Sequence, residues 1–314
     1  MGRFVLRRLL QSVVVLLGVT LVVFLLLQLV PGDPVRVSLG TRFDQQTYDA
    51  LRERSGLDRP LVVQYLSYVG NALTGDLGVS FRSGQPVTTI VLQRLPATLS
   101  LAVTAVLLAL LVAFPLGVLS AVRSGSLVDH AARVFSQFGV SVPDFWMGIM
   151  GILLFAGVLG WLPPSGYVPL TDDPVGWASH VALPAAAVGL VTASILTRFI
   201  RSSVLEVLAE DYVRTAEAKG LRPRVVVVRH VLRNALIPVV TVVGVQLASL
   251  VGGVIVIEVL FAWPGVGRLT YDAVQARDYP VLQGAVLFVA TLFLLMNLLV
   301  DVLYARLDPR ITLR

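Results

Sequence analysis

The chain has 314 residues, of which 56% are hydrophobic and 14% charged, and its formal net charge is +6. Soluble domains carry about 25% charged residues, so this composition excludes an ordinary soluble protein and favours a membrane protein. The absence of cysteine excludes disulfides and thiolate metal sites. His130, His180 and His230 lie far apart in the sequence, so we expect no metal site.

Six apolar segments are long enough to cross about 30 Å of hydrocarbon as helices. They cover residues 9–30, 99–122, 134–162, 181–200, 236–261 and 281–304. The first follows several arginines, as a signal peptide would, but it is longer than a signal-peptide core and no A-x-A-like site follows it. We therefore expect an uncleaved helix. Pro143-Asp144 interrupts the third segment, which makes it the least regular of the six.

The distribution of arginine predicts the orientation. Connections after even-numbered spans, together with the two tails, hold most of the positive charge, whereas residues 163–180 contain Asp172 and Asp173 but no Lys or Arg. The loop 31–98 contains arginines, but loops longer than roughly 60 residues are translocated largely regardless of charge. The basic connections stay inside, so we expect both termini in the cytoplasm.

The spans divide the chain into three parts. Residues 1–30 form a tail and the first membrane helix, residues 31–98 form an extracytoplasmic loop domain, and residues 99–314 form a core with five further spans. We expect helices near 45–55 and 60–73 within the loop domain. At that size its own hydrophobic core is small, so it should pack against membrane helices or a partner.

The cytoplasmic loop 198–234 predicts a helix, a tight turn and a second helix. An apolar stripe recurs at helical spacing through Leu205, Leu208, Tyr212 and Ala216. Gly220 suits a position after a helix that needs a positive φ, and Pro223 can open the next helix. This pattern fits a segment that docks onto a partner, and equally a helix that lies on anionic lipid.

A Walker A motif requires Gly-x-x-x-x-Gly-Lys-Ser/Thr. The only lysine is Lys219, which Gly220 and Leu221 follow, so this chain has no such motif. If transport is driven by ATP, a separate chain must supply the ATPase.

The cytoplasmic loop also carries a resemblance to a known family. From Asp211 the sequence reads Asp-Tyr-Val-Arg-Thr-Ala-Glu-Ala-Lys-Gly-Leu, and Asn234-Ala235 and Ile237-Pro238 follow. This resembles the EAA loop of binding-protein-dependent ABC importers, in the form found in dipeptide, oligopeptide and nickel permeases. The general Glu-Ala-Ala positions hold Arg214, Thr215 and Ala216, so the acidic residue is missing and Ala216 and Gly220 carry the match.

Further stretches in the same order resemble this family over nearly the whole chain. They include Pro31-Gly32-Asp33-Pro34, Leu57-Asp58-Arg59-Pro60, Gly75-Asp76-Leu77-Gly78 with Ser80-Phe81, Gly160-Trp161-Leu162-Pro163, Glu258, Pro264-Gly265, Asp278-Tyr279-Pro280 and Asp308-Pro309-Arg310. Each match alone is weak, and their order makes the resemblance specific.

The resemblance implies an all-α integral membrane protein with the type I ABC importer permease fold, in a bacterial inner membrane. It implies a second homologous permease, two ABC ATPase subunits and an extracytoplasmic substrate-binding protein as partners, with no nucleic acid. ATP and magnesium would bind the ATPases, and this chain would bind no cofactor. Peptide is the expected substrate class, with nickel or another small solute as the alternative. The residues implied to contact the ATPase are Thr215, Ala216, Glu217, Ala218, Gly220 and Leu221.

A few polar residues in the apolar segments are candidates for the translocation pathway: Asp144, Gln246 and Asn297. For Asp144 we favour a structural interpretation, in which it complements a helix N-terminus at the break after Pro143. Gln246 and Asn297 could equally form hydrogen bonds between helices. The rival class, a self-sufficient secondary transporter or channel, would need pore-facing ion carriers, for which Asp144 is the single fair candidate. No motif supports an intramembrane enzyme.

Overall fold

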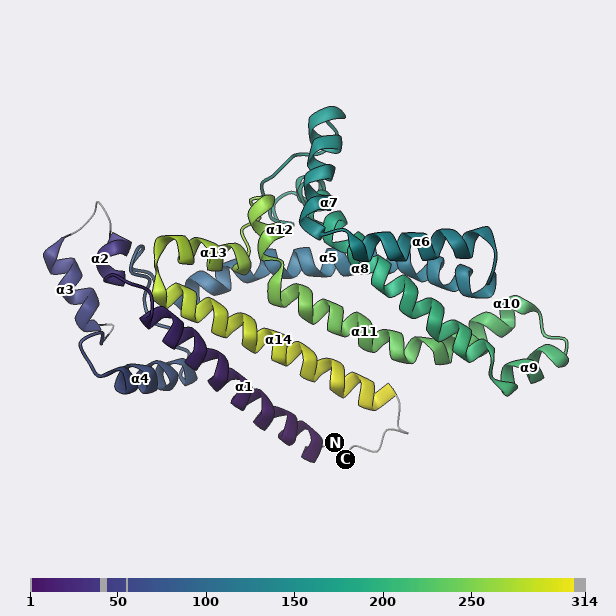
Figure 1. The fold of residues 1–314 in the computed structure, drawn as a ribbon, viewed down its shortest axis with the longest axis horizontal. Coiled ribbons are helices and arrows are strands. Elements are labelled where there is room, and N and C mark those ends of the chain that lie inside the picture. The colour runs from purple at the N-terminus through teal and green to yellow at the C-terminus, as the bar shows by residue number, and fades with distance from the viewer. Residues whose placement is uncertain (1, 40–43, 55, 308–314) are drawn as a thin grey trace. The chain divides into compact units, whose positions relative to one another are not determined.

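The computed structural model describes residues 2–39, 44–54 and 56–307, which form helices joined by short loops (Figure 1). The chain forms two compact units. The first contains residues 2–99 and 251–294, and the second contains residues 100–250 and those from 295 onward. Helices α5, α11 and α14 contribute residues to both. The stretch Asp308-Pro309-Arg310, which resembles the family, lies outside the described residues.

The first unit is built on the N-terminal helix and the predicted loop domain. Its helices are α1 (Gly2–Gln28), α2 (Pro34–Leu39), α3 (Gln45–Arg54), α4 (Leu61–Leu73), the start of α5 (Val87–Val122), α12 (Ile255–Leu260), α13 (Val266–Ala276) and most of the first half of α14 (Tyr279–Leu307). Helices α3 and α4 match the two helices predicted in the loop. Buried Val87, Val91, Val266 and Ala285 form a shared core, so the loop domain does pack on membrane helices.

The second unit contains the remaining spans. Its helices are the rest of α5, α6 (Leu127–Ser141), α7 (Asp144–Gly151), a π-helical segment Ile152–Val158, α8 (Pro174–Leu208), α9 (Asp211–Ala218), α10 (Pro223–Val225), a second π-helical segment Val226–Val231, α11 (Leu232–Gly253) and the end of α14. Small residues bring these helices together. A Cβ on Gly189 of α8 would lie 2.9 Å from the Ala105 carbonyl oxygen of α5, so the close approach of the two backbones requires glycine.

Five described helices are long and apolar enough to cross a membrane, and the pair α6 and α7 makes a sixth if it counts as one broken span. The third predicted span is therefore not a straight helix. Its two halves are bent by 100°, because Pro143 lacks an N–H and keeps Val142 in an extended conformation, with φ −100° and ψ 126°.

The helix boundaries also differ from the predicted apolar segments. Helix α5 begins at Val87 rather than near residue 99, since Val87 and Val91 are fully buried although polar residues separate them from the apolar run. The fifth predicted segment, 236–261, is two helices: α11 ends at Gly253, and Val254 leaves the helical conformation before α12. Helix α8 extends to both sides of segment 181–200, and its first turn is capped by Asp173, which accepts from the Val175 N–H at 3.0 Å.

Candidate functional site

The cytoplasmic loop predicted at 198–234 contains the end of α8, α9, α10 and the π-helical segment Val226–Val231. The apolar stripe predicted to run along one helix is divided between two. Helix α8 ends at Leu208, and Glu210 has extended backbone (φ −72°, ψ 143°) before α9 begins. Leu205 and Leu208 therefore lie on α8, whereas Tyr212 and Ala216 lie on α9. Leu205, Leu208 and Ala216 pack on the same core, whereas Tyr212 is exposed.

Helix α9 is amphipathic and packs on its own chain. Val213 is 1% exposed and Ala216 6%, and both belong to a cluster with Val226 and Val231. Ala216, one of the residues implied to contact the ATPase, has its side chain turned inward, where a small residue lets α9 approach segment 226–231. The other predicted contact residues are exposed: Thr215, Glu217, Ala218, Gly220 and Leu221.

Gly220 forms the turn that was predicted from its position. Its φ is +75°, and its N–H donates to the Glu217 carbonyl at 2.9 Å. A Cβ at this position would meet no atom within 4 Å, so glycine is favoured by the backbone conformation and not by crowding. Pro223 is the first residue of α10, as expected from its missing N–H.

Hydrogen bonds attach this turn to the membrane helices. Asn234 Nδ2 donates to the Tyr212 hydroxyl at 2.7 Å, and Ser203 Oγ donates to the Ala235 carbonyl at 2.7 Å. The first bond joins α9 to α11 and the second joins α8 to α11. A displacement of α9 would therefore be transmitted to α11, and through α11 to α8.

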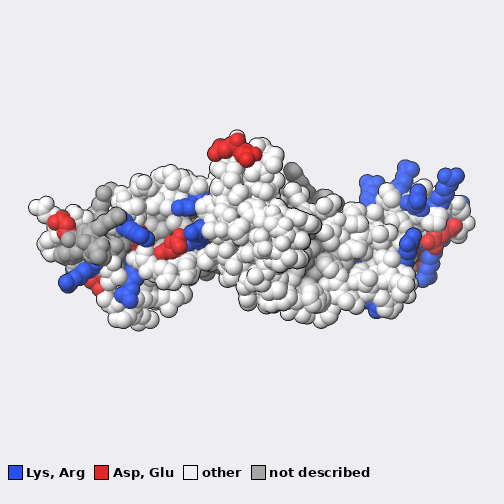
Figure 2. All heavy atoms as spheres, turned by 90° about the horizontal axis from the view of Figure 1, so that it is seen from above, with Lys and Arg blue, Asp and Glu red and all other residues white. Residues whose placement is uncertain are grey.

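Basic side chains surround the turn. Figure 2 shows Lys and Arg gathered at the end that carries α9 and α10, beside an almost uncharged helical surface. The exposed basic residues in this part of the chain are Arg214, Lys219, Arg222, Arg224, Arg229 and Arg233. Arg214 lies 3.6 Å from Asp211, both highly exposed, so this pair contributes little to stability.

Sequence reasoning missed a buried ion pair next to this region. Asp129 of α6 is 1% exposed and accepts from Arg201 Nε at 2.6 Å and Nη2 at 3.0 Å, and from the Gly125 N–H at 2.9 Å. Ser126 caps α6 by accepting from the Asp129 N–H. The spacing Ser126-x-x-Asp129 resembles a capping box and could have indicated the start of α6, but the partner Arg201 is 72 residues away.

The structure separates the three predicted pathway residues onto different helices. Asp144 is in the first turn of α7, and its Oδ1 lies 2.7 Å from the Phe145 N–H. That position agrees with the preferred interpretation, in which Asp144 complements a helix N-terminus. Gln246 lies half-buried on α11 and Asn297 half-buried on α14. Both remain predictions for the pathway.

In the first unit, Glu258 has a structural role that its contacts show. Its buried carboxylate accepts from Thr98 Oγ1 at 2.8 Å and from the Arg268 N–H at 2.8 Å. The adjoining loop contains Gly265, at which a Cβ would lie 2.0 Å from Glu258 Oε1. Glu258 thus fixes the loop between α12 and α13 against the start of α5.

Two stretches that resembled the family separately form one contact. Buried Asp278 accepts from Ser80 Oγ and, at 3.1 Å, from the Phe81 N–H. These residues are 198 positions apart, so no local signal could have paired them.

The comparisons with known proteins agree with this architecture. The model of the family "Binding-protein-dependent transport system inner membrane component" matches residues 113–313, and the N-terminal model of the same component matches residues 1–102. The chain belongs to this family. It is therefore a permease subunit of an ABC importer and a multi-pass inner-membrane protein.

Relatives of this permease match it from end to end. It is 44% identical to the di/tripeptide transport system permease protein DppB of Pseudomonas aeruginosa, over 98% of each chain. It is 43% identical to the dipeptide transport system permease protein DppB of Escherichia coli, over 99% of each chain. A putative peptide transport system permease of Brucella abortus is 42% identical, also over 99% of each.

A solved structure shares the fold of this permease. It is the MetNI methionine ABC transporter in an inward-facing conformation, with a TM-score of 0.57 and 18% identity, covering 70% of this chain and 96% of that chain. The likeness supports the importer permease fold.

Proposed function

We propose that this permease forms half of the translocation pathway of an ATP-driven importer of di- and oligopeptides. The observation that carries the proposal is the match of 42–44% identity over almost the full length to permeases named for peptide transport. Nickel or another small solute is the alternative within the same family.

The second half of the pathway would be a homologous permease. Two ABC ATPase subunits would bind ATP and magnesium, since this chain has no Walker A sequence, and an extracytoplasmic binding protein would deliver the solute. The exposed basic end at α9 and α10 would face the cytoplasm, which places both termini there as well.

The turn at Gly220 would contact an ATPase. Thr215, Glu217, Ala218 and Leu221 are exposed around it, whereas Val213 and Ala216 hold α9 to its own chain. An exposed turn on a helix that is held to its own chain suits a segment that a partner displaces and that transmits this movement to the membrane helices. A helix lying on anionic lipid would instead turn an apolar face outward, and the apolar face of α9 is buried.

The function is tested by uptake of a labelled dipeptide into cells that express the complete importer. We expect uptake to stop when the ATPase genes are deleted and to persist when the proton gradient is collapsed while ATP is maintained. Uptake that needs the gradient but not the ATPases would instead establish a secondary transporter. Labelled nickel in the same assay distinguishes the alternative substrate.

A further inference from the structure

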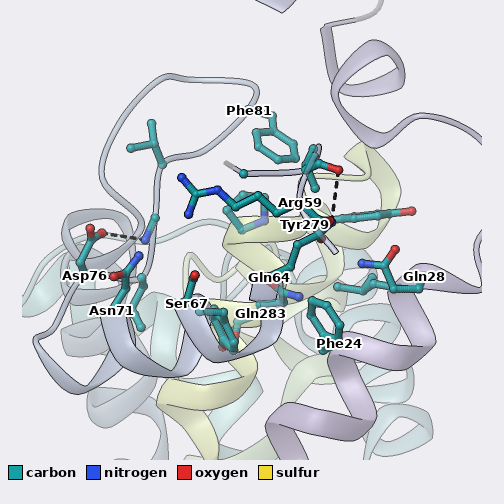
Figure 3. A pocket seen from close by; sticks show the side chains of 18 residues that line it. Phe24, Gln28, Arg59, Gln64, Ser67, Asn71, Asp76, Phe81, Tyr279 and Gln283 are labelled. Carbon is teal, nitrogen blue, oxygen red and sulfur yellow. Dashed lines mark hydrogen bonds between the residues drawn. The ribbon is translucent and has the colours of Figure 1, made fainter. Parts of the chain in front are cut away.

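A pocket of about 270 Å³ lies within the first unit (Figure 3). It is lined by the end of α1, by α4, by the loop 76–81 and by the start of α14. Its apolar lining includes Phe24, Leu27 and Phe81, while amides from Gln28, Asn71 and Gln283 give it hydrogen-bonding groups.

Two charged residues line this pocket, Arg59 and Asp76. Figure 3 shows the Arg59 side chain extending over the pocket, and within the described part of the chain no carboxylate forms a salt bridge with it. Asp76 uses one oxygen to accept from the Gly78 N–H at 2.9 Å. The Tyr279 hydroxyl is buried and has no hydrogen-bond partner in the described residues. The pocket thus presents a cation and an anion, whereas the Tyr279 hydroxyl in its wall has no exposed surface.

One lining hydroxyl is already engaged. Tyr68 donates to the Gln283 carbonyl at 3.2 Å, and burial raises the pKa of Tyr68. It remains protonated and holds α4 against the start of α14, which keeps the pocket's walls together.

The pocket lies at the depth of a membrane surface. The apolar span of α1 ends at Gln28 and that of α14 begins at Tyr279, and both residues line the pocket. A point where one span ends and another begins is at the level of the lipid head groups.

Helix α4 follows α1 from this level into the membrane. Tyr65 lies at 3.1 Å from Thr20 Oγ1 and donates to the Leu17 carbonyl. Leu17 is 11 residues before Gln28, which corresponds to about 16 Å along a helix. The opposite side of α4 is exposed and apolar, with Val62 at 70%, Leu66 at 63% and Leu73 at 84%. Helix α4 therefore packs one side on α1 and presents an exposed apolar face that suits contact with acyl chains.

We propose that this pocket binds the head group of a zwitterionic phospholipid, with the phosphate toward Arg59 and the ammonium toward Asp76. A guanidinium is well suited to phosphate oxygens, and the side-chain amides of the lining supply further hydrogen bonds. The acyl chains would lie along the exposed apolar surfaces of α1 and α4. The proposal does not depend on which solute is transported.

The test is lipid retention by the purified complex reconstituted in nanodiscs with equal amounts of phosphatidylethanolamine and phosphatidylglycerol. Native mass spectrometry should detect retained phosphatidylethanolamine on the wild type. In Arg59→Gln its retention should fall about tenfold, the usual loss for a charge-assisted hydrogen bond. Arg82→Gln is the matched control, an exposed arginine of the same loop domain outside the pocket, and should retain lipid as the wild type does.

Asp76→Asn gives an independent readout, because asparagine keeps an acceptor for the Gly78 N–H while it removes the charge. We expect this variant to lose its preference for phosphatidylethanolamine over phosphatidylglycerol. Equal retention of both lipids by the wild type, or unchanged retention in both variants, would overturn the proposal. Displacement of the lipid by inorganic phosphate or by a dipeptide at millimolar concentration would assign the pocket to a soluble ligand and would also overturn it.

Discussion

Gly220 has a backbone conformation that residues with a side chain rarely adopt. Its surroundings nevertheless leave room for a side chain. A non-glycine residue with left-handed backbone costs about 1–2 kcal/mol, and a β-branched side chain worsens this. The expected response is a shifted turn, with the cluster around Val213 and Ala216 left intact.

We therefore predict that Gly220→Val inserts normally but couples poorly. Uptake per ATP hydrolysed should fall by about tenfold or more, because a conformational cost of roughly 1.4 kcal/mol changes an equilibrium constant tenfold. The measurement is dipeptide uptake and ATP hydrolysis in proteoliposomes. The matched control is Gly84→Val, which has φ +69° and equally open surroundings in the loop domain. Wild-type coupling in Gly220→Val would remove the turn from the mechanism.

A second pair of glycine substitutions distinguishes the effect of steric crowding from the effect of backbone conformation on stability. Gly265→Ala would place a Cβ against the buried Glu258 carboxylate, so we predict a loss of about 1–3 kcal/mol of stability from overpacking. Gly70→Ala, within α4 and with no atom within 4 Å of the added Cβ, should instead stabilise by up to about 1 kcal/mol. Thermal unfolding in detergent compares the two. Equal effects would contradict the packing around Glu258.

At the scale of elements, the buried carboxylate of Asp129 links α6 to α8. Arg201 and the Gly125 N–H both bind Asp129, which fixes the loop before α6 to the C-terminal part of α8. Removal of one partner of a buried ion pair leaves the other charge uncompensated.

We predict that Asp129→Ala lowers the free energy of unfolding by roughly 3 kcal/mol, measured by thermal inactivation of the detergent-solubilised protein. Asp211→Ala removes a carboxylate from the exposed pair with Arg214 and should cost less than about 1 kcal/mol. If both variants behaved alike, the Asp129 pair would not hold α6 to α8.

Element boundaries show which local signals are sufficient. Pro143 and Pro223 mark a break and a helix start correctly, because proline acts through its own ring and missing N–H. The start of α5 at Val87 has no such signal. Its first turns are helical because Val87 and Val91 are buried against α13 and α14. A search for continuous apolar segments does not include these turns, because polar residues separate the two valines from the apolar run.

For the whole molecule, orientation is the property to be tested, and the absence of cysteine makes the test direct. Thr215→Cys and Ser83→Cys place single thiols at exposed positions in the loop 198–234 and in the loop domain. In intact spheroplasts an impermeant maleimide should label Ser83→Cys and leave Thr215→Cys unlabelled until the membrane is permeabilised. The reverse pattern would invert the topology and exclude the ATPase contact.

The sequence by itself determined the membrane class, the Gly220 turn and the family resemblance, because these depend on composition, period and single residues with strong backbone preferences. Only the tertiary structure decided that Ala216 faces inward and that Asp129 meets Arg201. It also decided that Ser80 meets Asp278. Helical spacing shows that one face of a helix is buried, but not which distant segment covers that face. An ion pair between residues 72 positions apart produces no periodic pattern in the sequence.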